Sequence, residues 1–200
     1  MPNTTDNFDI PFLDGTELVR DYPQFSEDLA EAIDAGLVSA RGLIAVKSAI
    51  RTTPVVVSGI AAGGNFAVPD LSITHEVSDP TNRLIISAFF GLAGHTQTVA
   101  QVGLAINDGV GFIAVGDAGG GSQPRVSAGG RAAASSDEAV TMPSVTFVHT
   151  PGAGSKTYTV HAFNLHTATN TIFINRTQGD NNNERHPRGV SSLVIQEVAV

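Results

Sequence analysis

Apolar and polar residues alternate with a period of two along most of the chain after residue 41. Successive side chains of a β-strand point to opposite faces, so this period predicts strands separated by turns rather than helices. The clearest alternation comprises Leu84, Ile86, Ala88, Phe90 and Leu92. Counting similar segments between turn residues predicts about ten strands, at 42–50, 54–60, 71–77, 84–92, 102–106, 110–115, 142–149, 157–165, 171–176 and 191–198.

The segment Leu84–Val115 contains three of these strands in close succession. Asn107, Asp108 and Gly109 form a turn sequence between the second and the third. We therefore expect three consecutive antiparallel strands. With glycine- and proline-rich turns, the pattern predicts an all-β fold, a jelly-roll-like antiparallel β-sandwich.

The first 40 residues follow another pattern. Residues 1–15 have no periodicity and predict an extended arm, whereas Asp21–Leu37 has an N-cap candidate in Asp21 and an apolar residue at every fourth position. This predicts one short helix, which must pack on a sheet or on copies of itself because it is too short to be stable alone. The expected division is an N-terminal arm and helix at 1–40 and a β-sandwich head at 41–200.

Two strands near the C-terminus carry apolar residues on both faces, at Thr157–Leu165 and Thr171–Arg176. An antiparallel sheet open to water on one side alternates more cleanly, so a second surface must be covered. Another subunit or the N-terminal helix could cover it, and the sequence does not separate the two. If a subunit does, the candidate trimer interface is Tyr158, His161, Phe163 and Phe173.

Composition narrows the class of function. The chain carries 11 basic and 19 acidic residues, a net charge of −8, and its basic residues are scattered, so nucleic-acid binding is not expected. It has no cysteine, which excludes disulfides and thiolate metal sites. Met1–Asp9 lacks the features of a signal peptide, and no apolar run is long enough to span a membrane, so we expect no membrane insertion.

No motif predicts catalysis or a cofactor. The glycine-rich segments Gly59–Gly64 and Gly116–Gly121 lack the Gly-Lys-Ser/Thr ending of a P-loop and are interpreted as turns. The six histidines have no metal-ligand spacing; a cross-strand pair of His149 and His161 is possible, but hydrogen-bonded structural histidines are the favoured interpretation. No nucleophile elbow or carboxylate pair stands out. We therefore expect no enzymatic activity, no metal and no cofactor.

The loop Gln178–Gly189 is the most promising exposed segment, because its polar side chains offer many hydrogen-bond donors and acceptors to a sugar or a protein. The alternative is a solvated crossing in which Arg185 or Arg188 pairs locally with Asp180 or Glu184. The two interpretations are compatible. The candidate recognition residues are Asp180, Asn181, Asn182, Asn183, Arg185 and Arg188.

Two segments carry a resemblance to a known family. The succession of Lys156–Phe163, Thr171–Arg176, the polar loop and Ser191–Val198 resembles the C-terminal heads of phage tail-fibre and C1q/TNF-like trimeric virion proteins. The run Pro11–Ile33 is similar to the opening of many tailed-phage minor tail and fibre proteins. The middle of the chain carries no such resemblance, and no repetitive shaft is present.

The resemblance implies a phage virion protein, made in the host cytoplasm, with a homotrimeric head exposed for attachment to a host glycan or protein. It also implies that the N-terminal segment binds other virion proteins. The virion-attachment candidates are Phe12, Leu18, Tyr22, Phe25, Leu29 and Ile33. Two alternatives stay open: a capsid decoration or head-fibre protein that stabilises the shell, and a soluble carbohydrate-binding β-sandwich.

Overall fold

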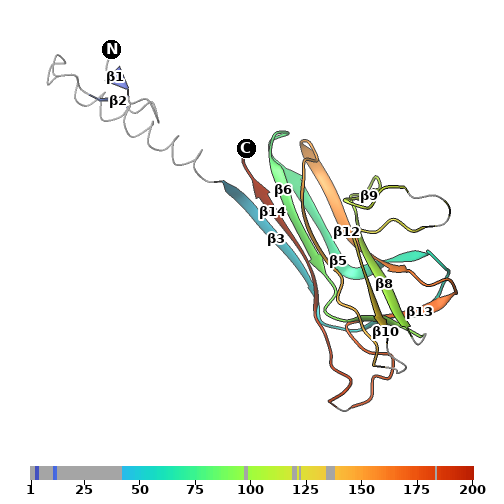
Figure 1. Ribbon diagram of the computed structural model, residues 1–200. Coiled ribbons are helices and arrows are strands. Elements are labelled where there is room, and N and C mark those ends of the chain that lie inside the picture. Colours follow the sequence, from blue (N-terminus) through green and yellow to red (C-terminus); the bar gives the residue numbers. More distant parts are fainter. Residues whose placement is uncertain are drawn as a thin grey trace. The chain divides into compact units, whose positions relative to one another are not determined.

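The computed structural model describes residues 3–4, 11–12, 42–96, 99–118, 121, 123–133, 138–182 and 184–200. These residues form β-strands, turns and loops, with no helix among them, and the strand pairs with an assigned register are antiparallel (Figure 1). The strands are β1 (Asn3–Thr4), β2 (Pro11–Phe12), β3 (Leu43–Arg51), β4 (Val55–Ile60), β5 (Asn65–Val77), β6 (Arg83–Phe89), β7 (Ala93–His95), β8 (Val99–Asn107), β9 (Phe112–Ile113), β10 (Ala128–Ala133), β11 (Ser144–His149), β12 (Gly154–Asn164), β13 (Asn170–Ile174) and β14 (Ser191–Val198).

Three sheets build the head. The β12 sheet has the order β10-β8-β12-β5, with β9 attached to β8, and the β14 sheet has the order β11-β6-β14-β3. A smaller β13 sheet, β4-β13-β7, adjoins them. Figure 1 shows the strands of the two larger sheets running alongside one another. The chain passes between these sheets at most of its connections, and the predicted all-β sandwich is confirmed.

One hydrophobic core fills the space between the sheets, and it follows from the period-two pattern. Tyr158, Val160 and Ala162 project from the β12 sheet and are fully buried. Leu193 and Ile195 meet them from the β14 sheet and are also fully buried. Burying one aliphatic side chain of this size contributes about 1.5–3 kcal/mol, so alternating residues of this kind dictate which face of each strand points inward.

The expectation of three consecutive antiparallel strands from Leu84 to Val115 is wrong for the first of them. β6 pairs with β11 and β14, whereas β8 belongs to the other large sheet. The chain leaves the β14 sheet at Gly91, where an ideal Cβ would lie 2.3 Å from the carbonyl oxygen of Val190. The β8–β9 hairpin is confirmed, and its turn is closed by Asp108, whose carboxylate accepts hydrogen bonds from the amides of Val110 and Gly111.

Apolar residues on the second face of β12 are covered by the chain itself. The ring of Phe112, on β9, makes edge-to-face contacts with His161 and with Phe163, each at a centroid distance of 5.1 Å. The imidazole of His161 also shares a hydrogen bond of 2.9 Å with Asn65. The β8–β9 hairpin therefore covers this part of the second face, so His161 and Phe163 do not by themselves require a partner subunit.

The N-terminal predictions fall largely outside the described residues. The helix predicted at 21–37 lies there, as do Leu18, Tyr22, Phe25, Leu29 and Ile33. In the described part, β1 and β2 form an antiparallel pair that includes the backbone of Phe12. The chain divides into two compact units, Met1–Ile44 with Ala199 and Ala45–Val198 with Val200. Attachment through residues 1–40 stays a prediction.

Candidate functional site

The 178–189 loop connects β13 to β14, the two strands that flank it in the sequence prediction (Figure 1). Asn181 and Asn182 are exposed, and so are Arg185 and Arg188, whose side chains have exposed fractions of 76% and 53%. Asn183 lies outside the described residues. The loop therefore presents amide and guanidinium groups to solvent.

Asn175 anchors the base of this loop and was missed by the sequence analysis. Its side chain is fully buried; the amide nitrogen donates to the carbonyl of Arg51 at 2.8 Å, and the amide oxygen accepts from the Ser191 hydroxyl at 2.6 Å. Its backbone N–H donates to Leu92, and its carbonyl accepts from Gly189. With φ at +63°, Asn175 adopts the left-handed conformation that asparagine tolerates better than most residues.

A second tie lies inside the loop. Thr177 and His186 are both buried, and their side chains share a hydrogen bond of 2.7 Å between Oγ1 and Nδ1. The backbone N–H of Asp180 donates to the same hydroxyl at 3.4 Å. A side-chain bond across nine residues closes the loop on itself, so the exposed asparagines between them stand on a fixed base.

Asp180 lies between two guanidinium groups. Its carboxylate oxygens are 2.9 Å from Arg176 and 2.7 Å from Arg188, which confirms the expected local pairing of Arg188 with Asp180. Arg176 also donates to the carbonyls of Thr177 and Gln178. Asp180 is thus engaged within the chain, and the half-exposed Arg188 and the exposed asparagines are the groups that can address a ligand.

The glycine-rich segment that begins at Gly116 continues as a loop to Pro124, and its described residues, 116–118, 121, 123 and 124, are exposed. Arg125 closes it by donating to the carbonyl of Gly116 at 2.7 Å. The other glycine-rich segment, Gly59–Gly64, forms the turn between β4 and β5, with φ values of +78° at Gly59 and +68° at Gly63. Its interpretation as a turn is confirmed.

The four candidate interface residues all contact other parts of the chain. Tyr158 has no exposed surface and belongs to the core. His161 and Phe163 pack against Phe112, and Phe173 is 6% exposed with the guanidinium of Arg176 5.3 Å from its ring centre. Self-association stays a prediction, but these side chains do not require it.

The described histidines do not form a metal site. His149 lies opposite Leu84 on β6, whereas His161 lies opposite Ala105 and Ala67, so the two are not cross-strand neighbours. No group of three or more His, Asp or Glu side chains among the described residues could hold a metal ion. In the same part of the chain, no helix is long and apolar enough to cross a membrane.

A shallow hollow of about 290 Å³ lies over β8 and β10. Its lining consists of Gln101, Gly129, Gly130, Arg131 and Leu165. The side chain of Leu165 lies directly over Gly129, where an added Cβ would come within 2.9 Å of it. No aromatic ring is among these lining residues, so the hollow offers a sugar no stacking surface.

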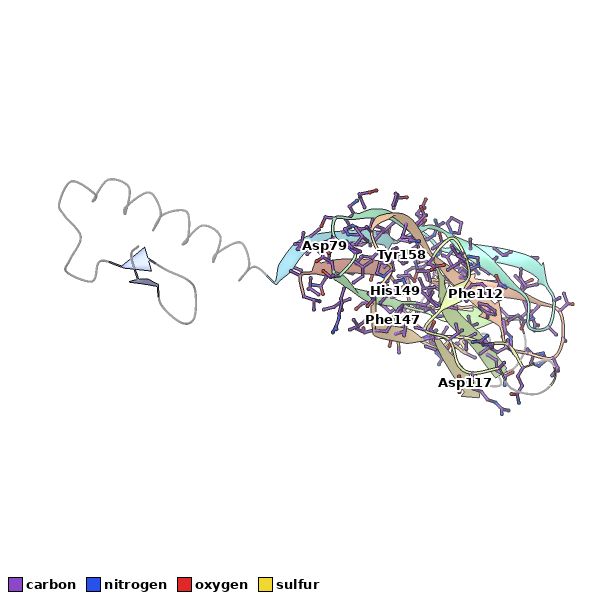
Figure 2. The ribbon with its side chains drawn as sticks, turned by 90° about the horizontal axis from the view of Figure 1, so that it is seen from above. Asp79, Phe112, Asp117, Phe147, His149 and Tyr158 are labelled. Carbon is purple, nitrogen blue, oxygen red and sulfur yellow. The ribbon has the colours of Figure 1, made fainter. Side chains whose placement is uncertain are left out.

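The fully buried Tyr158 and the partly buried His149 lie side by side in the strand-rich unit (Figure 2). Their rings meet edge to face at 5.9 Å, and neither the Tyr158 hydroxyl nor His149 Nε2 has a hydrogen-bond partner. Burial, with the Asp108 carboxylate adding to it, raises the pKa of Tyr158 to about 12. Burial also lowers the pKa of His149. Both rings are therefore mainly neutral at pH 7; Tyr158 packs in the core, and the partly buried His149 packs against it.

Tyr158→Phe is expected to leave the free energy of unfolding unchanged or to raise it by up to about 1 kcal/mol, because it removes a hydroxyl that is buried without a partner. Urea unfolding at a fixed protein concentration measures this. Tyr158→Leu, which also removes the ring, is the control and should cost about 3 kcal/mol. A loss of more than about 1 kcal/mol in Tyr158→Phe would show that the hydroxyl is hydrogen-bonded in solution.

No protein-family model matches the chain, and no curated protein matches it. Among solved structures, it is similar to the crystal structure of the enzymatically active domain of tailspike protein 4 from bacteriophage CBA120. That match has 12% sequence identity and a TM-score of 0.23, and it covers 72% of this chain. The chain spans only 19% of the length of the tailspike chain. At this TM-score the match carries no argument about fold or activity.

Proposed function

We propose that the protein is a phage virion component of the tail-fibre, spike or minor-tail type, whose homotrimeric β head attaches to the host. The observation that carries this proposal is the 178–189 loop, whose exposed polar groups stand on a base fixed by Asn175. A rigid scaffold that displays a polar loop is the usual arrangement for recognition. Residues 1–40 would bind other virion proteins.

The chemistry of the loop suits a hydroxyl-rich or carboxylate-bearing surface, such as a host glycan or a polar protein face. Asn181 and Asn182 each offer an amide donor and an acceptor, and Arg188 offers a planar guanidinium. Arg188 remains half-exposed while it pairs with Asp180. The absence of enzymatic activity is part of this proposal and stays a prediction.

Replacing Asn181, Asn182 and Asn183 together with alanine is expected to reduce binding to host cells at least tenfold. The exposed Asn181 and Asn182 should each change the free energy of unfolding by less than about 0.5 kcal/mol, because exposed side chains contribute little to stability. Cell-binding assays and urea unfolding measure the two effects. Thr167→Ala with Thr169→Ala, in the exposed turn between β12 and β13, is the matched control and should keep full binding.

Full cell binding by the triple variant would place recognition elsewhere. Immunogold labelling of particles separates the wider alternatives. Label at the tail supports the proposal, whereas label over the shell favours a capsid decoration or head-fibre protein. Label on no particle, combined with binding to free glycans, favours a soluble carbohydrate-binding protein and overturns the proposal.

A further inference from the structure

The outer face of the β14 sheet carries apolar side chains that nothing in the described part of the chain covers. Strand register places Ile85 and Phe89 of β6 on this face, with Val148 of β11 opposite Ile85 and Val194 of β14 opposite Ser87. Phe89 is 42% exposed and Val148 is 60% exposed. Their neighbours 84, 86, 88, 193 and 195 point inward and are buried, so the assignment of the face follows from alternation.

This face is almost free of charge. The outward positions from 85 to 89, 144 to 148 and 192 to 196 hold only apolar residues, serine, threonine and glutamine. Arg83, opposite Val198, lies at the end of the face. The whole chain has 19 acidic and 11 basic residues, so this face carries less charge than the chain does on average.

The outward face of the β12 sheet differs. Next to β5 it is polar and exposed, with hydroxyl pairs between Ser72 and Thr159 and between Thr74 and Thr157, each at 2.9 Å. Glu76 is exposed on the same side. Farther along, the chain's own Phe112 covers the apolar residues. Of the two large sheets, only the β14 sheet therefore presents an uncovered apolar face among the described residues.

The apolar surface continues onto β3, which is the edge strand beside β14. Val46 is 55% exposed and Ile50 is 61% exposed. An exposed apolar edge strand is a liability in a monomer, because it invites pairing with another chain. Because β3 lies beside β14 in the same sheet, its exposed apolar residues enlarge the uncharged face.

We propose that the outer face of the β14 sheet is where copies of this chain meet. A second copy fits it because two molecules of net charge −8 repel one another, and contact through a face without acidic residues adds least to that repulsion. The centres of protein interfaces are similarly depleted of charge and apolar. The inference rests on the proposed self-association and not on the proposed attachment to a host, and it places the interface away from Tyr158, His161, Phe163 and Phe173.

Val148→Lys tests this, with Ser72→Lys on the exposed face of the β12 sheet as the matched control. Native mass spectrometry at micromolar concentration should show an oligomer for the unaltered chain and for Ser72→Lys. Val148→Lys should weaken association at least tenfold and yield folded monomer, as judged by circular dichroism. A monomeric unaltered chain, or an intact Val148→Lys oligomer, overturns the proposal.

A labelling experiment covers the case in which Val148→Lys does not fold. The chain has no cysteine, so Val148→Cys and Ser72→Cys each introduce a single thiol. In the native protein, maleimide should label Ser72→Cys at least tenfold faster than Val148→Cys, and dilution to monomer should remove the difference. Equal rates at high concentration overturn the proposal. If a variant loses cell binding while its labelling rates stay the same, the interface proposal stands and only the proposed attachment function is affected.

Discussion

Glu197→Ala is expected to lower the free energy of unfolding by about 3 kcal/mol or more, because it breaks a buried polar network. Glu197 projects inward from β14 and is 1% exposed. Its carboxylate accepts from Asn82 at 2.6 Å and from His75 Nε2, on the opposite sheet, at 2.8 Å. The hydroxyl and amide of Ser78 donate to it as well. Removing the acceptor takes from the buried His75 the partner of its Nε2 and from the buried Asn82 its shortest hydrogen bond.

The same network makes stability depend on acid. Burial raises the pKa of Glu197, but hydrogen bonds from Asn82, His75 and Ser78 lower it by more, so the net pKa in the folded protein lies below the ordinary 4.5. A carboxyl group with a depressed folded pKa stabilises the protein above its unfolded pKa. Its contribution is therefore complete above about pH 4.5 and is lost as the pH falls through the folded pKa.

Urea unfolding at pH 7 and at pH 3 measures both effects, at one protein concentration because association adds to apparent stability. Glu76→Ala is the matched control, since Glu76 is the exposed neighbour of His75 on β5, and it should cost less than about 0.5 kcal/mol. The difference between the unaltered chain and Glu197→Ala should shrink at pH 3. A cost near that of Glu76→Ala would contradict the network.

The strands could be predicted from the sequence, whereas their partners could not. Ser191–Val198 begins and ends as predicted, because its alternation of buried and outward residues is local information. Alternation does not encode which strand lies alongside. β6 is followed by the β7–β8 segment, yet it pairs with β11 and β14. The chain leaves the sheet where Gly91 passes so close to Val190 that a Cβ would not fit.

The sequence shows that the strand at 157–165 carries apolar residues on both faces, but it does not show what covers the second face. The sequence could not show that Phe112, in the short β9, folds back over His161 and Phe163, because this contact joins residues about fifty positions apart. The sequence alone also did not predict the apolar outer face that β6 and β11 form. Ile85 lies between the inward-pointing Leu84 and Ile86, so its own side of the strand does not stand out in the sequence. Only the register brings Ile85 and Val148 together on one face.

The candidate loop was predicted in part. Asp180 and Arg188 carry opposite charges a few residues apart, which is enough to expect their pairing. Asn175 and His186 were missed because their roles depend on distant atoms, such as the carbonyl of Arg51. An Asn-Arg step at the end of a strand could have suggested a left-handed residue, since asparagine is one of the few residues that adopt that conformation readily.

Asn175→Ala is expected to lower the free energy of unfolding by about 3 kcal/mol and to loosen the 178–189 loop. The substitution removes the donor to the Arg51 carbonyl and the acceptor for the buried Ser191 hydroxyl, and it forces alanine into a left-handed conformation. Urea unfolding measures the first effect. Amide hydrogen exchange, which should accelerate at least tenfold in residues 178–189, measures the second.

Asn175→Gly separates the two causes, because glycine adopts the left-handed conformation freely but also lacks the side-chain hydrogen bonds. It should be about 1 kcal/mol more stable than Asn175→Ala and should still show the faster exchange in the loop. Asn181→Ala, an exposed asparagine of the same loop, is the control and should change neither quantity. If cell binding depends on a fixed loop, both Asn175 variants should bind less tightly even though Asn175 touches no ligand. Unchanged exchange in the loop would show that Thr177 and His186 alone hold it.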